Sequence, residues 1–187
     1  MKMIRVVLLS LLGIGCGGAS LSNVRMDLAP GRLPRATMLF VPQADSSATV
    51  FKGDGSDEPK AVATARQTLR DALASQVVTA LREAGFQANP PPGTAGGLAT
   101  EPVTVWMVVR ECNWGSSAAR ALVGFGAGAA YLLTDVKLVK GNALIADFTV
   151  DANSGGRAGL HAVGDFMPQF MQQTAGLVAE YLTNRMK

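Results

Sequence analysis

The chain of 187 residues contains few of the residue types on which common active sites depend. It has one histidine, His161, and two cysteines, Cys16 and Cys112. A zinc site needs several such ligands close together, which this set does not provide. The G-x-S-x-G motif of one large class of serine hydrolases is also absent. We therefore predict no catalytic residue, no cofactor and no metal site, and a hydrolase that uses His161 is only a third alternative.

The chain also lacks an excess of charge of one sign and is poor in aromatic residues. Seventeen Lys and Arg face 14 Asp and Glu, a formal charge of +3, and aromatic residues make up 6%. Lys2 and Arg5 lie in a segment that we expect to be removed, which leaves 15 basic against 14 acidic residues, or +1. Nucleic-acid binding needs a concentrated basic face or a stacking platform, so we predict no nucleic-acid partner.

No apolar run reaches the roughly 20 residues of a membrane-spanning helix, but the N-terminus has a shorter one. Lys2 and Arg5 precede ten uncharged residues, Val6 to Gly15, and small residues then surround Cys16. This layout is typical of a secretory signal and resembles the lipobox of bacterial lipoproteins. We predict a signal peptide over residues 1–15 and a lipid such as palmitate on Cys16. Cleavage near Ser20, which would discard Cys16, is the alternative.

The remaining chain divides into a linker and one domain. Residues 16–35 are small and polar with two prolines, which predicts a lipidated tether with a reach of about 25 Å. Residues 36–187 have the length of a single domain. Cys112 follows a valine-rich run, so we expect it to be a buried small side chain.

Apolar spacing predicts two long amphipathic helices and a hairpin in that domain. The first helix follows Pro59 and stops at Gly85, and the last extends from about Phe166 to Leu182. Between them, a Gly141-Asn142 turn joins two alternating strands. We predict an α/β (α+β) two-layer sandwich with a mixed sheet of four to five strands. Two apolar rows face its core: Leu132, Thr134, Val136 and Leu138, and Leu144, Ala146, Phe148 and Val150.

Two acidic residues lie four apart on the second hairpin strand. Asp147 and Asp151 would be about 13 Å from each other at the rise of a strand. Glycosidase carboxyl pairs are closer, at about 5 to 9.5 Å. We interpret the two acids as the solvent-exposed face of the hairpin.

The stretch Arg120 to Asp135, RALVGFGAGAAYLLTD, is rich in glycine and uncharged between its ends. It formally fits the dinucleotide motif G-x-G-x-x-[GA], but it does not directly follow a strand. Spanning a membrane as one helix would need a longer run. We interpret the glycines as allowing close backbone packing before the first hairpin strand.

The same stretch, together with the lipoprotein-like leader, REAGF and FTVDANSGG, resembles a bacterial lipoprotein family known as domain of unknown function 4410. The resemblance implies an exported, envelope-associated α/β domain and no established activity. The layout is more loosely similar to the curli-secretion lipoprotein and the N-terminal domain of TolB. The matching residues, which we take as structural or interaction candidates, are Arg120, Gly124, Phe125, Gly126 and Gly128.

These observations predict a non-enzymatic cell-envelope lipoprotein that serves as an adaptor or assembly factor in the periplasm. Gly17 follows Cys16 in place of the aspartate that retains lipoproteins at the inner membrane, so we expect the outer membrane. The expected partners are the membrane, through the lipid on Cys16, and an envelope protein or polymer, which the glycine segment and the loop 153–159 could bind. A homo-oligomer is compatible with the sequence, and the alternative function is an oligomeric secretion-channel subunit.

Overall fold

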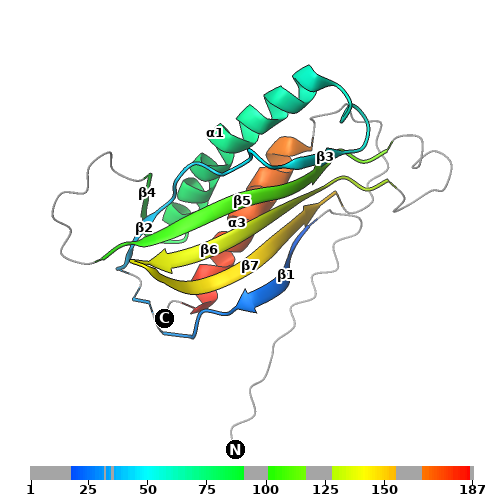
Figure 1. Ribbon diagram of the computed structural model, residues 1–187. Coiled ribbons are helices and arrows are strands. Elements are labelled where there is room, and N and C mark those ends of the chain that lie inside the picture. The colour runs from blue at the N-terminus through cyan, green and yellow to red at the C-terminus, as the bar shows by residue number, and fades with distance from the viewer. Residues whose placement is uncertain are drawn as a thin grey trace, which may run out of the picture.

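The computed structural model describes residues 18–31, 33–34, 36–90, 101–116, 128–154 and 166–185. These residues form seven strands and two helices, arranged as one sheet with a helical layer (Figure 1). In chain order the elements are β1 (Ala19–Met26), β2 (Met38–Phe40), β3 (Val50–Lys52), α1 (Pro59–Glu83), β4 (Gln87–Asn89), β5 (Val103–Asn113), β6 (Tyr131–Lys140), β7 (Ala143–Asn153) and α3 (Met167–Arg185).

The sheet is mixed, with the order β1-β7-β6-β5-β2-β4, and β3 pairs separately with β5. The long strands β5, β6 and β7 are antiparallel neighbours, and β1 extends this part on the β7 side. The short strands β2, β3 and β4 pair in parallel. The predicted α+β class is confirmed, but seven strands replace the expected four to five. The additional strands were not predicted because they are only three residues long or, in the case of β1, show little alternation of apolar and polar residues.

Both helices lie on the same side of the sheet and pack against each other (Figure 1). The buried stripe of α1 includes Leu69, Leu73, Val77 and Leu81, which agrees with the predicted spacing. In α3 the buried side chains include Phe170 and Leu182. The core therefore lies between the helical layer and one face of the sheet.

Helix α1 ends where the sequence predicts. The backbone N–H of Gly85 donates to the carbonyl of Arg82, and that of Phe86 donates to the carbonyl of Leu81. Phe86 is buried in the core. These bonds satisfy carbonyls of the last turn, which is the usual way in which glycine ends a helix.

The predicted hairpin is present, with one correction in its second strand. Gly141 and Asn142 form the turn, and Gly141 adopts a positive φ of 56°. A bulge after Leu138 shifts the register, so that Val139 pairs with Leu144. Leu144 was expected in the core but is 40% exposed, and Ile145 is buried instead. The bulge moves one residue to the other face because side chains alternate along a strand.

The stretch predicted as a tether is partly a strand. Residues Ala19–Met26 form β1, whose Ala19 pairs with Ala152 and whose Leu21 pairs with Val150. The sequence ASLSNVRM shows little apolar alternation, because β1 is an edge strand with mostly exposed side chains. Its structure depends on hydrogen bonds to β7, which local sequence does not reveal.

Candidate functional site

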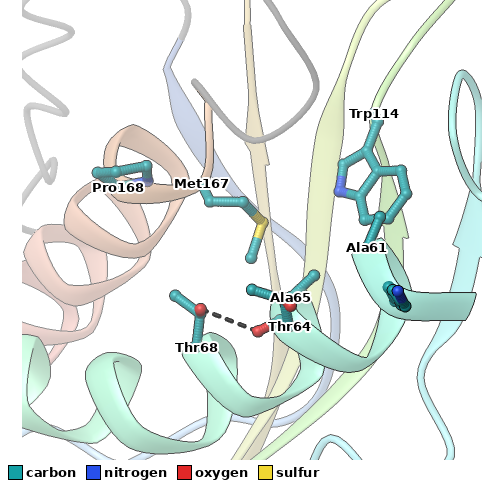
Figure 2. Close-up of a pocket in the computed structure, with 8 residues that line it drawn as sticks. Ala61, Thr64, Ala65, Thr68, Trp114, Met167 and Pro168 are labelled. Atoms are coloured by element: carbon teal, nitrogen blue, oxygen red, sulfur yellow. Dashed lines mark hydrogen bonds between the residues drawn. The ribbon is translucent and has the colours of Figure 1, made fainter. Parts of the chain in front are cut away.

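A pocket lies between the first turns of α1 and α3, next to the end of β5 (Figure 2). Its volume is about 420 Å³, which is within the range of small-molecule and peptide side-chain sites. The hydroxyl of Thr68 donates to the carbonyl of Thr64 at 2.9 Å, so this polar group is already paired within the helix. The walls are mostly apolar and comprise Lys60, Ala61, Thr64, Ala65, Thr68, Trp114, Met167 and Pro168.

Trp114 forms the wall beside the sheet. Its ring packs against Phe51 with 5.4 Å between centroids, and the residue is 5% exposed. The indole N–H is buried, has no oxygen or nitrogen acceptor among the described residues, and interacts with the Cys112 thiol. In Figure 2 the indole nitrogen lies on the side of the ring that faces Met167. Trp114 therefore contributes its apolar ring to the wall of the pocket.

Cys112 lies behind this wall and is fully buried, as predicted. Its sulfur is 3.6 Å from the sulfur of Met167. Burial raises the pKa of the Cys112 thiol to about 12, which keeps it protonated at neutral pH. A protonated, buried thiol is not a nucleophile, so Cys112 contributes packing rather than chemistry.

The described ends of the two glycine-rich stretches meet at this same end of the sheet. The N–H of Ser116 donates to the carbonyl of Gly128 at 3.0 Å, and that of Ser154 donates to the carbonyl of Ala130 at 3.0 Å. Gly128 has a φ of 68°, in the left-handed region that glycine tolerates best. The other predicted positions lie outside the described residues: Arg120, Gly124, Phe125, Gly126, His161 and the lipid attachment residue Cys16.

The sheet face turned away from the helices has a charge cluster that the sequence did not predict. Arg25 of β1 forms an ion pair with Asp147 and another with Asp135 at 3.2 Å. It also donates to the hydroxyl of Thr149 at 3.2 Å, and Thr149 donates to Asp135 at 2.6 Å. Asp147 was expected to be exposed but is only 8% exposed. The correction follows from β1, which places the guanidinium of Arg25 over it.

The charges in this cluster stabilise one another. The hydrogen bond from Arg25 lowers the pKa of Asp147 below its usual range and outweighs the opposing effect of burial. The same bond raises the pKa of Arg25. Both groups are therefore ionised at neutral pH. A carboxylate held in this way is a poor general base, and the cluster is better suited to fixing β1 than to catalysis.

A second cluster joins β3, β5 and β6. Lys52 forms an ion pair with Glu111 at 2.8 Å, and the hydroxyl of Tyr131 donates to the same carboxylate. Burial raises the pKa of Glu111, but the hydrogen bonds from Lys52 and Tyr131 together lower it by more than burial raises it. The pKa of Glu111 is therefore below its usual value. The hydrogen bond to Glu111 raises the pKa of Tyr131. The phenol stays protonated, and the cluster links three strands.

Within the described ranges, no group of three or more His, Cys, Asp or Glu residues is placed to hold a metal ion. Neither of the two helices described is both long and apolar enough to cross a bilayer. Because its walls are mostly apolar and lie between the two helices and the sheet, we consider the pocket beside Trp114 for binding.

The family model named Domain of unknown function (DUF4410) matches residues 40–167. The chain belongs to the DUF4410 family. This confirms the resemblance found in the sequence, and the matched range includes the glycine segment and most of the sheet.

Two solved structures are similar to this DUF4410 member at low identity. A PelC dodecamer from Paraburkholderia phytofirmans is 14% identical, with 88% of this chain and 98% of that chain covered and a TM-score of 0.47. A protein of Xanthomonas campestris with family model DUF330 is 15% identical, with 86% and 92% covered and a TM-score of 0.46. No curated protein matches the sequence significantly.

Sequence reasoning missed the pocket and the Arg25 cluster of this DUF4410 member. Trp114 follows directly after the valine-rich strand β5. An aromatic residue at the end of a strand was the one sequence feature that could have indicated the pocket. Arg25 offered none, because its partners Asp135 and Asp147 are more than a hundred residues away in the chain. Such a contact depends on the pairing of β1 with β7.

Proposed function

We propose that this chain is a cell-envelope lipoprotein that acts as a non-enzymatic adaptor or assembly factor. In this proposal Cys16 carries the lipid and the domain lies on the periplasmic face of the outer membrane. The pocket between α1 and α3 receives an apolar segment of an envelope protein partner. The mostly apolar pocket beside Trp114 is the observation on which the binding proposal rests.

The lining of the pocket favours an apolar guest. Ala61, Ala65 and Met167 present carbon and sulfur atoms, while Lys60 adds a cationic group. The ring of Trp114 adds an aromatic wall next to these side chains. Binding sites of this kind combine apolar burial with a few placed polar groups.

The start of β1, which follows the proposed anchor in the chain, lies at the same end of the sheet as the pocket. Ala19 pairs with Ala152, Ala152 with Leu132, and Leu132 with Cys112, so one row of partners joins the start of β1 to the end of β5. Cys16 precedes Ala19 by three residues, which span at most about 11 Å. A lipid on Cys16 would therefore hold this end of the domain near the membrane, where envelope partners are anchored.

Site-specific crosslinking in intact cells tests the binding proposal. A photoreactive residue at Thr68, on the rim of the pocket, should capture a defined partner. The matched control at Glu83 lies on the same helix, in its last turn, and should not capture it. Ala65→Trp should fill the pocket and reduce capture from Thr68 while the melting temperature stays near that of the wild type. Equal capture from both positions would contradict the proposal.

Metabolic labelling with a fatty acid tests the anchor. The wild type should incorporate label, and Cys16→Ser should not. If both proteins were labelled equally, the lipidation proposal would be wrong. Fractionation of the two membranes then tests the outer-membrane location.

A further inference from the structure

A second pocket lies on another face of α1, between this helix and the segment that joins β2 to β3. Its volume is about 500 Å³, and it shares no lining residue with the pocket beside Trp114. Its lining is more polar than that of the first pocket and includes Gln43, Asp45, Ser47, Arg66, Gln67 and Arg70. A ligand of this pocket must therefore satisfy charged and hydrogen-bonding groups.

Two arginines line this pocket from successive turns of α1. Arg66 and Arg70 are four residues apart, so their Cβ atoms are about 5–6 Å from each other on one face of the helix. Like charges at this spacing repel each other and weaken a helix slightly. Among the described residues, neither arginine forms an ion pair with an acidic side chain, whereas Arg25 and Arg185 do. The pocket thus has two neighbouring cations without a counter-ion.

Neutral partners hold both guanidinium groups in place. Nη2 of Arg66 donates to the carbonyl of Thr49 at 3.3 Å, and the guanidinium lies 5.5 Å from the ring centroid of Phe51. Nε of Arg70 donates to Oε1 of Gln43 at 3.2 Å. Nη1 of Arg66 and both Nη atoms of Arg70 have no partner in the part of the chain that the structure describes. Donors that are already oriented bind a ligand at a lower entropic cost.

Asp45 sets the charge that the pocket can accept. Its carboxylate accepts hydrogen bonds from the hydroxyl of Ser47 at 2.7 Å and from the backbone N–H of Ser47 at 2.9 Å. These bonds lower the pKa of Asp45 below its usual value, so it is ionised at neutral pH. Two arginines and one aspartate give the pocket one net positive charge. This charge complements a monoanion better than a dianion such as a phosphate ester.

We propose that this pocket binds a small ligand through a single carboxylate, which contacts the guanidinium groups of both Arg66 and Arg70. Guanidinium and carboxylate groups match in geometry and form charge-assisted hydrogen bonds. The second oxygen of Asp45 then accepts a hydrogen bond from a hydroxyl or amide N–H beside the ligand carboxylate. Amino-acid derivatives and sugar acids both combine these groups, and both are small enough for a pocket of this volume. The site is independent of the pocket proposed for the protein partner.

Titration of the full chain, followed by NMR of its arginine Nε–H signals, tests the site. The probes are N-acetylserine and glucuronate, two monocarboxylates with hydroxyl groups, and the neutral amide of each. Nε of Arg66 is buried, so its proton is protected from exchange with water and can be observed. At least one acid should shift this signal saturably, and its neutral amide should not. The acid that saturates at the lower concentration identifies the ligand as an amino-acid or a sugar derivative.

Three variants, whose fold is checked by their backbone amide spectra, locate the binding. Arg66→Gln and Arg70→Gln should each weaken binding about tenfold, because each removes a hydrogen bond between charged groups. Binding to Arg66→Gln is followed through the signal of Arg70. The matched control, Arg82→Gln, removes the same charge from the same helix outside the pocket, where Arg82 donates to the carbonyl of Ala88. It should weaken binding less than about twofold, because salt screens a distant charge.

Three results would overturn the proposal. The first is the absence of a saturable shift with either acid. The second is equal weakening by Arg70→Gln and Arg82→Gln, which would mean that the acids respond to the overall charge of the domain. The third is tighter binding of inorganic phosphate than of both acids, since the pocket would then select for negative charge rather than for a carboxylate.

Discussion

The two faces of the central sheet are closed by different kinds of interaction. On the helix-covered face, Val136, Phe148 and Val150 are fully buried against the helical layer. On the other face, Asp147 and Thr149 are buried by a polar network centred on Arg25. Residues of β7 therefore alternate: one side chain packs in the apolar core and the next belongs to the ion cluster on the other face.

This contrast separates two sources of stability. The covered face is stabilised by removing apolar surface from water. This contribution grows with the area buried and does not depend on the direction of individual contacts. The open face depends on exact placement of a few charges, whose pairing must offset their loss of hydration. We expect substitutions on the two faces to differ in size, in pH dependence and in which strands they release.

The largest expected effect is on the covered face. Phe148 is fully buried and its ring lies 4.3 Å from that of Tyr181, centroid to centroid. Phe148→Ala should lower the free energy of unfolding by about 3–5 kcal/mol, because it leaves a cavity between β7 and α3. Denaturant unfolding measures this loss, and Phe148→Leu should lose much less. Equal losses in the two variants would show that volume is not the cause.

The next effect is on the open face. Arg25→Met should lower the free energy of unfolding by about 2 kcal/mol, because it removes the hydrogen-bonded counter-ion of the buried carboxylate of Asp147 and leaves only the nearby charge of Lys137. Hydrogen exchange should rise in β1 before the rest of the sheet. Arg185→Met, which removes a more exposed pair with Asp27, should cost less than about 1 kcal/mol. If both variants lost the same free energy of unfolding, burial of the Asp147 carboxylate would not be the reason why Arg25 stabilises the fold.

A smaller, pH-dependent effect should distinguish the faces further. The pKa of Asp147 is lowered in the folded protein, so its stabilising contribution is present above about pH 4 and lost as pH falls through the folded value. Denaturant midpoints measured between about pH 6 and pH 3 should therefore fall more steeply for the wild type than for Asp147→Asn. Parallel curves for the two proteins would mean that another group accounts for the acid sensitivity.

The smallest effect should be at Trp106, on the same open face but outside the ion cluster. This residue is 49% exposed, so Trp106→Ala should change the free energy of unfolding by no more than about 0.5 kcal/mol. Thermal unfolding measures the change. A loss close to that of Arg25→Met would show that the open face is also stabilised by apolar contacts that exposure does not reveal.

The sequence predicted the elements whose pattern is local. The 3.6-residue spacing of Leu69, Leu73 and Val77 identified α1, and Gly85 located its end. The Gly141-Asn142 pair located the hairpin turn. At the candidate site, burial of Cys112 was predicted, whereas the pocket beside Trp114 was not, because it forms only where α1 and α3 come together.

By itself, the sequence determined the α+β class, the two amphipathic helices and the family, because these depend on the spacing of apolar residues and on short motifs. Only the tertiary structure decided that residues Ala19–Met26 form a strand and that Asp147 is buried. It also decided the bulge that exposes Leu144. The physical reason is that an edge strand, a buried ion pair and a register shift depend on partners far away in the chain, which side-chain periodicity does not encode.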